Sequence, residues 1–393
     1  MSGPAAAVSI YTRQFWLVCV SSLLFFASFN MIIPELPAYL SSLGGADYKG
    51  LIISLFTLTA MVSRPFSGKL SDRIGRVPVM MVGSTVCFLC SLVYPLLTGI
   101  YGFFLLRLVH GFSTGFTPTG QTAFLSDIVP PHKRGEAMGF LGTAGSLGMA
   151  GGPAIGGLLA HQFSVNATFY CSSIFGLLSI LILAGIKETL PTRQRFNPAM
   201  LKINRHEIID RKVLVPCFIM LLCVFAFGAV YTLMPDFGEH VGINNKGLLF
   251  TYFTIATLLV RFIGGRASDQ YGRVAVLRVS TFFIIIALLI IGMAESRWPL
   301  IIGMSLYGLA YGITSPVLLA WATDLTDVNH KGKGVASLYI FMELGIGLGA
   351  ITSAWIYDND SNRFFITFAL CAFLTLTAFI YLVFRRRRSY VSH

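Results

Sequence analysis

Several residues that can carry a charge or a proton, Arg64 among them, lie inside long apolar stretches of this sequence, and three are candidates for proton coupling. Glu343, His110 and Arg107 each interrupt an apolar run long enough to cross a bilayer. An ionisable side chain in hydrocarbon is costly, so such residues usually face a cavity or a charged partner. Glu343 lies about 14 Å into its expected helix, near the bilayer centre. It is therefore the first candidate for a proton carrier, with His110 second.

The same three residues also have less specific interpretations. Glu343 could be a packed acid that is paired with Arg107 or hydrogen-bonded to a tyrosine. Arg107 lies only about 9 Å along its helix, so it could extend to the outer surface or form a structural ion pair. A single histidine is more often a satisfied hydrogen-bonding residue than a proton site. The sequence leaves these alternatives open.

The elements that hold these residues are expected to be membrane-spanning helices. Of the 393 residues, 55% are hydrophobic and 12% are charged, and the mean hydropathy is +0.74. So little polar surface cannot cover a water-soluble protein of this size, and the apolar runs are too long for barrel strands. The sequence predicts an all-α integral membrane protein. Twelve helices are expected, at 15–40, 50–68, 78–98, 101–125, 135–160, 165–186, 213–237, 246–265, 275–294, 298–322, 334–357 and 363–384.

A polar, basic segment at 187–212 divides the chain. We interpret it as a cytoplasmic linker between two six-helix bundles, residues 1–186 and 213–393. Most Lys and Arg residues fall in the loops of one side, which by the positive-inside rule places both termini in the cytoplasm. The net charge of +12 is thereby explained by topology rather than by nucleic-acid binding. The seven cysteines lack metal-type spacing, so neither a metal nor another cofactor is expected.

A charged stretch between apolar runs occurs twice. SGKLSDRIGR, residues 67–76, returns as GGRASDQYGR, residues 264–273, at an offset of 197 positions. Further matches at the same offset indicate that the second half is a copy of the first. Parallel halves around a membrane-normal axis are typical of secondary transporters, which hold the substrate between the halves. The matched pairs include Phe56 and Phe253, Arg64 and Arg261, Gly111 and Gly308, and Asp127 and Asp324.

The first copy resembles the signature of the major facilitator superfamily, Gly-x-x-x-Asp-Arg-x-Gly-Arg. The full signature continues with one more basic residue, and Val77 stands at that position. In the second copy, Gln270 replaces the arginine that follows the aspartate. The glycines allow close helix approach at Gly68 and a tight turn at Gly75, and Asp72 can pair with arginines across a cytoplasmic gate. The expected gate residues are Gly68, Asp72, Arg73, Gly75, Arg76, Asp127, Asp269 and Arg273.

Two further motifs resemble elements of that superfamily. RLVHG, residues 107–111, resembles its Arg-x-x-Gln-Gly element with His110 in place of glutamine. Residues 139–157 resemble the antiporter motif of its drug–proton antiporters, which implies an exporter. Ordinary small-residue packing would account for the glycines of this motif but not for its proline. The motif residues singled out are Gly148, Gly152, Pro153, Gly156 and Gly157.

Polar and aromatic residues near the outer ends of the first and seventh helices are candidates for an outer mouth. Glu35 and Asp236 each follow a proline there. We expect them to line or latch the mouth, with solvated helix ends as the alternative. Asn30, Tyr231 and Phe29 are expected to line the mouth or cavity.

The sequence therefore predicts a membrane transporter working by alternating access, and not an enzyme. The resemblance implies proton-coupled efflux of a small, partly apolar organic molecule. An exporter of sugars, amino acids or siderophores, a proton-coupled importer and a transporter-like sensor are the alternatives. The sequence contains no nucleotide-binding phosphate loop. The expected partners are protons, the small-molecule substrate and membrane lipid, with no nucleic acid, and the expected state is a monomer in the cell membrane.

Overall fold

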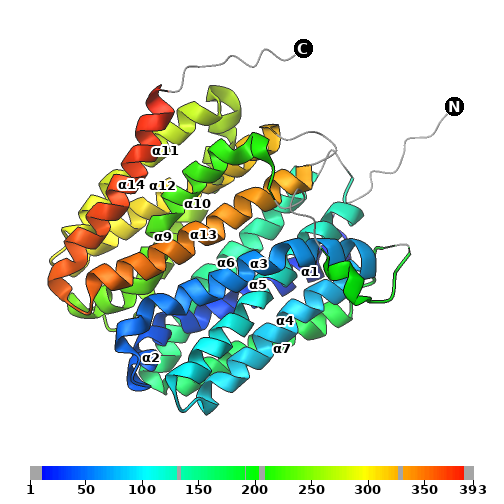
Figure 1. Ribbon diagram of the computed structural model, residues 1–393, viewed down its shortest axis with the longest axis horizontal. Helices are drawn as coiled ribbons and strands as arrows, with labels where there is room; N and C mark the ends of the chain where they lie inside the picture. The colour runs from blue at the N-terminus through cyan, green and yellow to red at the C-terminus, as the bar shows by residue number, and fades with distance from the viewer. Residues whose placement is uncertain (1–10, 131–133, 191, 203–208, 326–330, 385–393) are drawn as a thin grey trace.

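The computed structural model describes residues 11–130, 134–190, 192–202, 209–325 and 331–384, apart from the side chains of 134–136, 261–266, 269 and 331–333. The described residues are helical and contain no strand. Long helices form two bundles that lie side by side (Figure 1). The helices are α1 Arg13–Ile32, α2 Leu36–Ser42, α3 Lys49–Ile74, α4 Arg76–Val93, α5 Ile100–Ile128, α6 Arg134–Gln162, α7 Val165–Ala184, α9 Leu214–His240, α10 Leu248–Tyr271, α11 Arg273–Gly292, α12 Arg297–Leu325, α13 Lys331–Tyr357 and α14 Phe364–Phe384.

Nine helical segments among the described residues have the length and apolar composition to cross a membrane. The expected all-helical membrane fold is therefore confirmed. The long helices outside this set are α5, α6 and α10. Glycine and buried polar residues lower the hydropathy of α5 and α6, because these helices pack against other helices along much of their length. The number of crossings, twelve, stays a prediction.

Two glycines form equivalent tight turns in the two bundles. Gly75, between α3 and α4, has a φ of +127°, and Gly272, between α10 and α11, has a φ of +88°. Residues with a side chain rarely adopt these values, whereas glycine does so without steric cost. The turn predicted at Gly75 is confirmed, and the second copy of the motif turns in the same way.

Close packing is also repeated in the two bundles. A Cβ on Gly111 would lie 2.2 Å from the carbonyl oxygen of Phe56, and one on Gly308 would lie 2.2 Å from that of Phe253. Both glycines thus bring two helices into backbone contact, α5 with α3 and α12 with α10. The internal repeat read from the sequence is therefore a repeat in space.

The two bundles meet mainly along two pairs of helices. α3 packs against α13, and α6 packs against α10. We call these contacts the α3–α13 seam and the α6–α10 seam. Figure 1 shows α3, in blue, beside α13, in orange. The internal repeat relates α3 to α10 and α6 to α13. The two seams are therefore equivalent contacts in which the two halves exchange roles.

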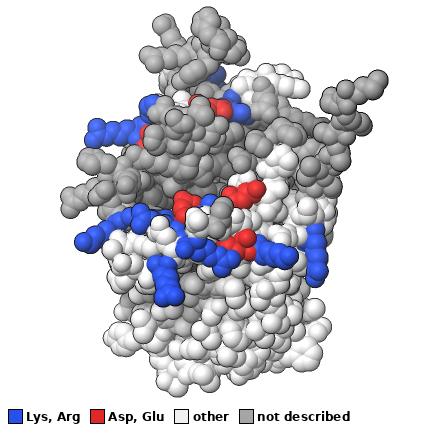
Figure 2. Space-filling view, turned by 90° about the vertical axis from the view of Figure 1, so that its right-hand side faces the viewer, with Lys and Arg blue, Asp and Glu red and all other residues white. Residues whose placement is uncertain are grey.

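Charged residues gather at the end of the molecule where α3 meets α4. Figure 2 shows Lys and Arg in a band there, with a few acidic residues among them. We call this end the basic face and the other end the opposite face. The cytoplasmic location predicted for the termini concerns 1–10 and 385–393, which lie outside the described residues.

Candidate functional site

Glu343 forms an ion pair with an arginine on the other side of the α3–α13 seam. Arg64 Nη2 on α3 donates to Glu343 Oε1 on α13 over 2.5 Å, between residues 279 positions apart. The side chains are 13% and 7% exposed, respectively. The Arg64 guanidinium also lies over the ring of Tyr339, 4.8 Å from its centroid. A carboxylate and a guanidinium from different halves are thus nearly buried together.

The pair lies in the middle of both helices. Arg64 is about 22 Å from the start of α3 and about 15 Å from its end, at 1.5 Å per residue. Glu343 is about 18 Å and about 21 Å from the two ends of α13 by the same rise. Its partner is Arg64, so the pairing with Arg107 considered from the sequence is wrong. Arg64 was recognisable as a charge inside an apolar run, but no sequence signal linked it to Glu343.

Arg107 and His110 lie together inside the first bundle. Arg107 Nε donates to the Ile52 carbonyl oxygen over 2.7 Å, and its Nη1 donates to the Tyr94 hydroxyl over 3.2 Å. Its guanidinium also lies 4.5 Å from the centroid of the Phe56 ring. Among the described residues no carboxylate lies within ion-pair distance of Arg107. The side chain is 1% exposed, so it does not extend to the outer surface.

His110 is fully buried beside this arginine. Its Nδ1 lies 3.4 Å from the Tyr94 hydroxyl, and its Nε2 lies 3.5 Å from Cys87 Sγ. Both ring nitrogens thus have neighbours within the bundle. The histidine and the arginine are brought together, but both lie apart from the ion pair at the seam.

The first motif loop is held by the segment that follows α7. Arg76 pairs with Asp72 over 2.5 Å and with Asp127 over 3.1 Å. The Glu188 carboxylate accepts from the backbone N–H groups of Arg76, over 3.0 Å, and Val77, over 2.9 Å. These N–H groups open α4, where an anion is favoured. Glu188, which the sequence analysis did not single out, therefore caps α4.

The second motif loop repeats part of this arrangement. Arg273 Nε donates to Asp324 over 2.9 Å, as Arg76 does to Asp127. Arg273 Nη1 donates to Ser268 over 2.6 Å. The Asp269 side chain, predicted as a gate residue, lies outside the described residues.

Two expectations for the first loop differ from the structure. Asp72 pairs within its own loop, its side chain is 73% exposed, and no ion pair joins it to the other half among the described residues. A Cβ on Gly68 would meet nothing within 4 Å among the described residues. The close helix approach expected there is therefore absent in this conformation.

The bundles are joined by polar contacts at the opposite face. Lys49 on α3 pairs with Asp236 on α9 over 2.5 Å, so the predicted acid does latch the two halves. Asn359 Nδ2 donates to the Ala46 carbonyl oxygen over 3.3 Å. Glu35 is buried at the same end. The structure is thus closed at the opposite face.

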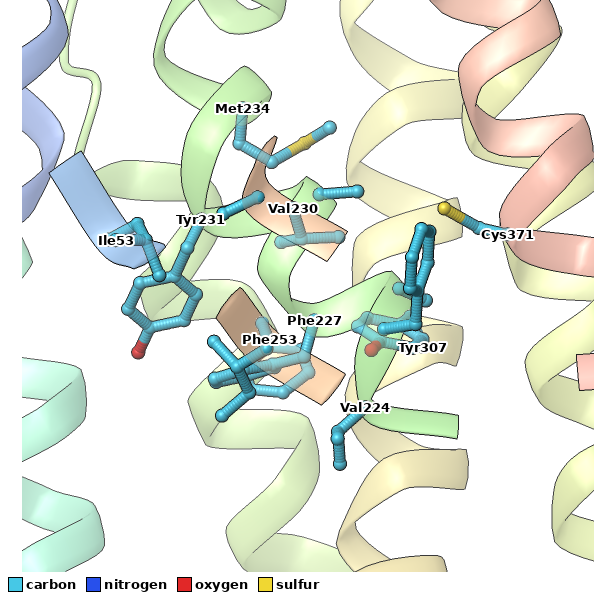
Figure 3. Close-up of a cluster of buried hydrophobic side chains, with 14 of the residues drawn as sticks. Ile53, Val224, Phe227, Val230, Tyr231, Met234, Phe253, Tyr307 and Cys371 are labelled. Atoms are coloured by element: carbon cyan, nitrogen blue, oxygen red, sulfur yellow. The ribbon is translucent and has the colours of Figure 1, made fainter. Parts of the chain in front are cut away.

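Other residues predicted for the mouth join the bundles deeper in the molecule. The Tyr231 hydroxyl donates to Asn30 Oδ1 over 3.1 Å, linking α9 to α1. Phe29 stacks on Phe56 with ring centroids 5.7 Å apart. On the second bundle, Phe227 stacks on Tyr311 at 5.0 Å and contacts Tyr231 and Phe253 (Figure 3). Aromatic side chains therefore come from both halves.

The antiporter-type motif has two packed faces on α6. A Cβ on Gly148, Gly152 or Gly156 would lie 2.3, 2.6 or 2.1 Å from a backbone carbonyl oxygen of α1. The expected glycine packing is confirmed, since no Cβ fits at these distances. On the other face a Cβ on Gly247 would lie 1.9 Å from the Pro153 carbonyl oxygen. A Cβ on Gly157 would likewise lie 2.2 Å from Asn245 Oδ1, so the motif also forms part of the contact between the halves.

The chain is similar to known membrane transporters. The family model of the Major Facilitator Superfamily matches residues 18–246 and 217–392. The multi-drug resistance efflux pump PmrA of Streptococcus pneumoniae is 26% identical over 355 residues, which are 86% of each chain. The multidrug resistance protein MdtG of Citrobacter koseri is 27% identical over 394 residues, covering 95% of this chain and 94% of MdtG.

Solved structures share the arrangement of helices. The crystal structure of the human organic anion transporter MFSD10 (TETRAN) matches with a TM-score of 0.74 and 21% identity. The match covers 94% of this chain and 99% of that one. A likeness at this identity shows the fold alone.

Proposed function

Because the chain belongs to the Major Facilitator Superfamily and is a multi-pass membrane transporter of small molecules, not an enzyme, we propose that it exports a small, partly apolar organic molecule in exchange for protons. The names of PmrA and MdtG, efflux and multidrug resistance, support the direction and the broad kind of substrate. The observation that carries proton coupling is the Glu343–Arg64 pair at mid-depth between the halves.

Glu343 is the proton carrier in this proposal. Its carboxylate belongs to one half and its arginine to the other, so movement of the halves changes its surroundings. An ionised carboxylate separated from its partner at this depth is costly, which favours a bound proton in one state and release in the other. The substrate competes with one of these states, and this competition couples the two fluxes. Arg107 and His110 have the secondary role of shaping the electric field of the first bundle.

The conformational cycle follows from the contacts between the halves. Lys49 and Asp236 join the halves at the opposite face, and we take this state as open at the basic face, where Asp72 pairs within its own half. With the basic face cytoplasmic, as the distribution of Lys and Arg favours, this state faces the cytoplasm. The alternate state breaks the latch and brings the two motif loops together, and there Gly68 and Asp72 make the cross-half contacts absent here. One chain carries both halves, so a monomer suffices.

The test is proton-driven uptake into inverted membrane vesicles, with norfloxacin and ethidium as probes. Glu343→Gln mimics the protonated carboxyl and should abolish uptake driven by an imposed pH gradient. Glu239→Gln is the matched control, because Glu239 lies at the end of α9 with its side chain 68% exposed. Wild-type gradient-driven uptake by Glu343→Gln would contradict the proposal.

A further inference from the structure

At mid-depth in the α3–α13 seam, one carboxylate faces one guanidinium. Glu343 has one guanidinium partner, Arg64, on the facing half. On the elements packed against α13, other described charged groups lie toward the helix ends rather than beside this pair. They are Asp47 before α3, Lys49, Lys69, Asp72 and Arg73 on α3, Asp236 and Glu239 on α9, Arg297 and Asp324 on α12, Arg211 and Lys212 in the segment before α9, and Arg363 before α14.

The pair retains an unused hydrogen-bond donor. Arg64 Nη2 is bonded to Glu343, whereas Arg64 Nε is buried and has no acceptor among the residues that the structure describes. A buried donor without a partner is costly, and a guanidinium binds a carboxylate best through two parallel N–H bonds. Arg64 therefore has the capacity for a second acidic group. The ring of Tyr339 covers one face of the guanidinium and leaves its edge for this contact.

The balance of charge decides which ligand can enter between these two residues. A simple organic cation that binds Glu343 would displace Arg64 and leave the arginine unpaired in a nearly buried place. A simple organic anion would share Arg64 with Glu343, so that one guanidinium would face two carboxylates and one negative charge would be left unbalanced. Removing one partner of a buried pair is strongly unfavourable, whereas replacing each partner by an equivalent charge is not.

We propose that the pair Arg64–Glu343 is the binding site for a zwitterionic substrate with an aromatic body, whose ammonium binds Glu343 and whose carboxylate binds Arg64. This inference rests on the proposed function and specifies its substrate class. The aromatic side chains of both halves, Phe29 with Phe56 and Phe227 with Tyr311, lie toward the closed opposite face and suit an apolar ring system. Each charge keeps a partner when the substrate is bound.

Competition with the proton follows from the same geometry. The ammonium group needs the ionised carboxylate of Glu343, and a proton on that carboxylate removes its charge. Substrate and proton therefore exclude one another at Glu343, as an exchanger requires. A zwitterion also crosses the low-dielectric middle of the protein without adding net charge.

The test is equilibrium binding to the purified full-length protein in detergent with matched sets of ligands. One set is norfloxacin, its ethyl ester and its N-acetyl derivative, which are a zwitterion, a cation and an anion with the same rings. The second set is tryptophan, its methyl ester and N-acetyltryptophan. In at least one set the zwitterion should bind at least tenfold more tightly than both singly charged forms. Glu343→Gln and Arg64→Gln should each remove this preference, while Glu239→Gln retains it.

Tightest binding of the cation or the anion in both sets would overturn the proposal, as would binding of neither zwitterion. A preference for the zwitterion that persists in both Glu343→Gln and Arg64→Gln would also overturn it. Because the assay measures binding without a gradient, it separates the two claims. If zwitterion binding depends on the pair but the protein shows no proton-driven transport, only the proposed function is refuted. If proton-driven transport occurs but the binding assay shows no preference for the zwitterionic form of the ligand, only this inference is refuted.

Discussion

The two seams between the halves are built from the same repeated helices but differ in their chemistry. In the α3–α13 seam, Arg64 faces Glu343. In the α6–α10 seam the offset of 197 places Ser146 where Glu343 stands, and Arg261 corresponds to Arg64. Ser146 donates to the carbonyl oxygen of Gly142 within its own helix. The repeat thus provides two equivalent contacts, and the acidic residue Glu343 distinguishes the one to which we assign proton exchange.

The two motif loops differ in a similar way. Both have an arginine–aspartate pair, Arg76 with Asp127 and Arg273 with Asp324. Glu188 caps α4 next to the first loop, whereas Arg385 stands at the equivalent offset after α14. The first loop is therefore anchored to the segment between the halves. We infer that the first half supplies the more rigid side of the basic face.

The largest expected effect is on the seam pair itself. Arg64→Gln or Glu343→Gln alone removes one partner of a nearly buried pair and should lower the free energy of unfolding by about 3–5 kcal/mol. The double variant should recover most of this loss, since no charge is left unpaired. Thermal unfolding in detergent measures it, and Ser146→Ala in the other seam is the control, with an expected change below about 0.5 kcal/mol. Additive losses in the double variant would show that the two residues act independently.

The next effect concerns the face of α6 that packs on α1. Gly156→Ala places a Cβ 2.1 Å from the Met31 carbonyl oxygen and should destabilise the first bundle by about 1–3 kcal/mol. Gly151→Ala on the same helix is the matched control, because a Cβ there meets nothing within 4 Å among the described residues. Thermal unfolding of the two variants compares them directly. Equal stability would mean that α6 and α1 can separate without cost.

The latch at the opposite face should control the conformational equilibrium more than stability. Lys49→Asp or Asp236→Lys places like charges together and should shift the population toward opening of that face by about tenfold, or about 1.4 kcal/mol. The exchanged pair, with both substitutions, should restore the closed state. Accessibility of a cysteine introduced at Ala46 to a membrane-impermeant maleimide measures the shift. Unchanged labelling in both single variants would exclude the latch.

The smallest effect is expected in the first motif loop. Asp72→Asn removes a pair whose acid is 73% exposed, so the folded state should lose at most about 1 kcal/mol. Transport should nevertheless slow, because Asp72 meets the other half in the alternate state. Asp269→Asn should be milder, since Gln270 replaces an arginine in its copy. Transport rates and cysteine accessibility at the two faces test both variants. An equal loss of transport rate in the two variants would contradict the expected difference between the two motif loops.

The sequence predicted the features that depend on the length and repetition of its apolar segments and on local backbone geometry. Apolar length predicted the helices, and the repeat at 197 positions predicted the equivalent turns at Gly75 and Gly272. It did not predict the partner of Glu343, because that contact joins residues 279 positions apart across a seam set by tertiary packing. Arg107, the other arginine considered, is occupied by the Ile52 carbonyl and Tyr94. The cap by Glu188 was missed for a similar reason, since it joins the segment after α7 to α4.

Substrate-evoked proton movement tests the central claim most directly. The protein would be reconstituted in vesicles containing a pH-sensitive dye, and norfloxacin would be added outside without an imposed pH gradient. The account predicts that the wild type and Glu239→Gln move protons out as norfloxacin enters, and that Glu343→Gln moves none. Proton movement by Glu343→Gln at the wild-type rate would contradict the assignment of coupling to this carboxylate.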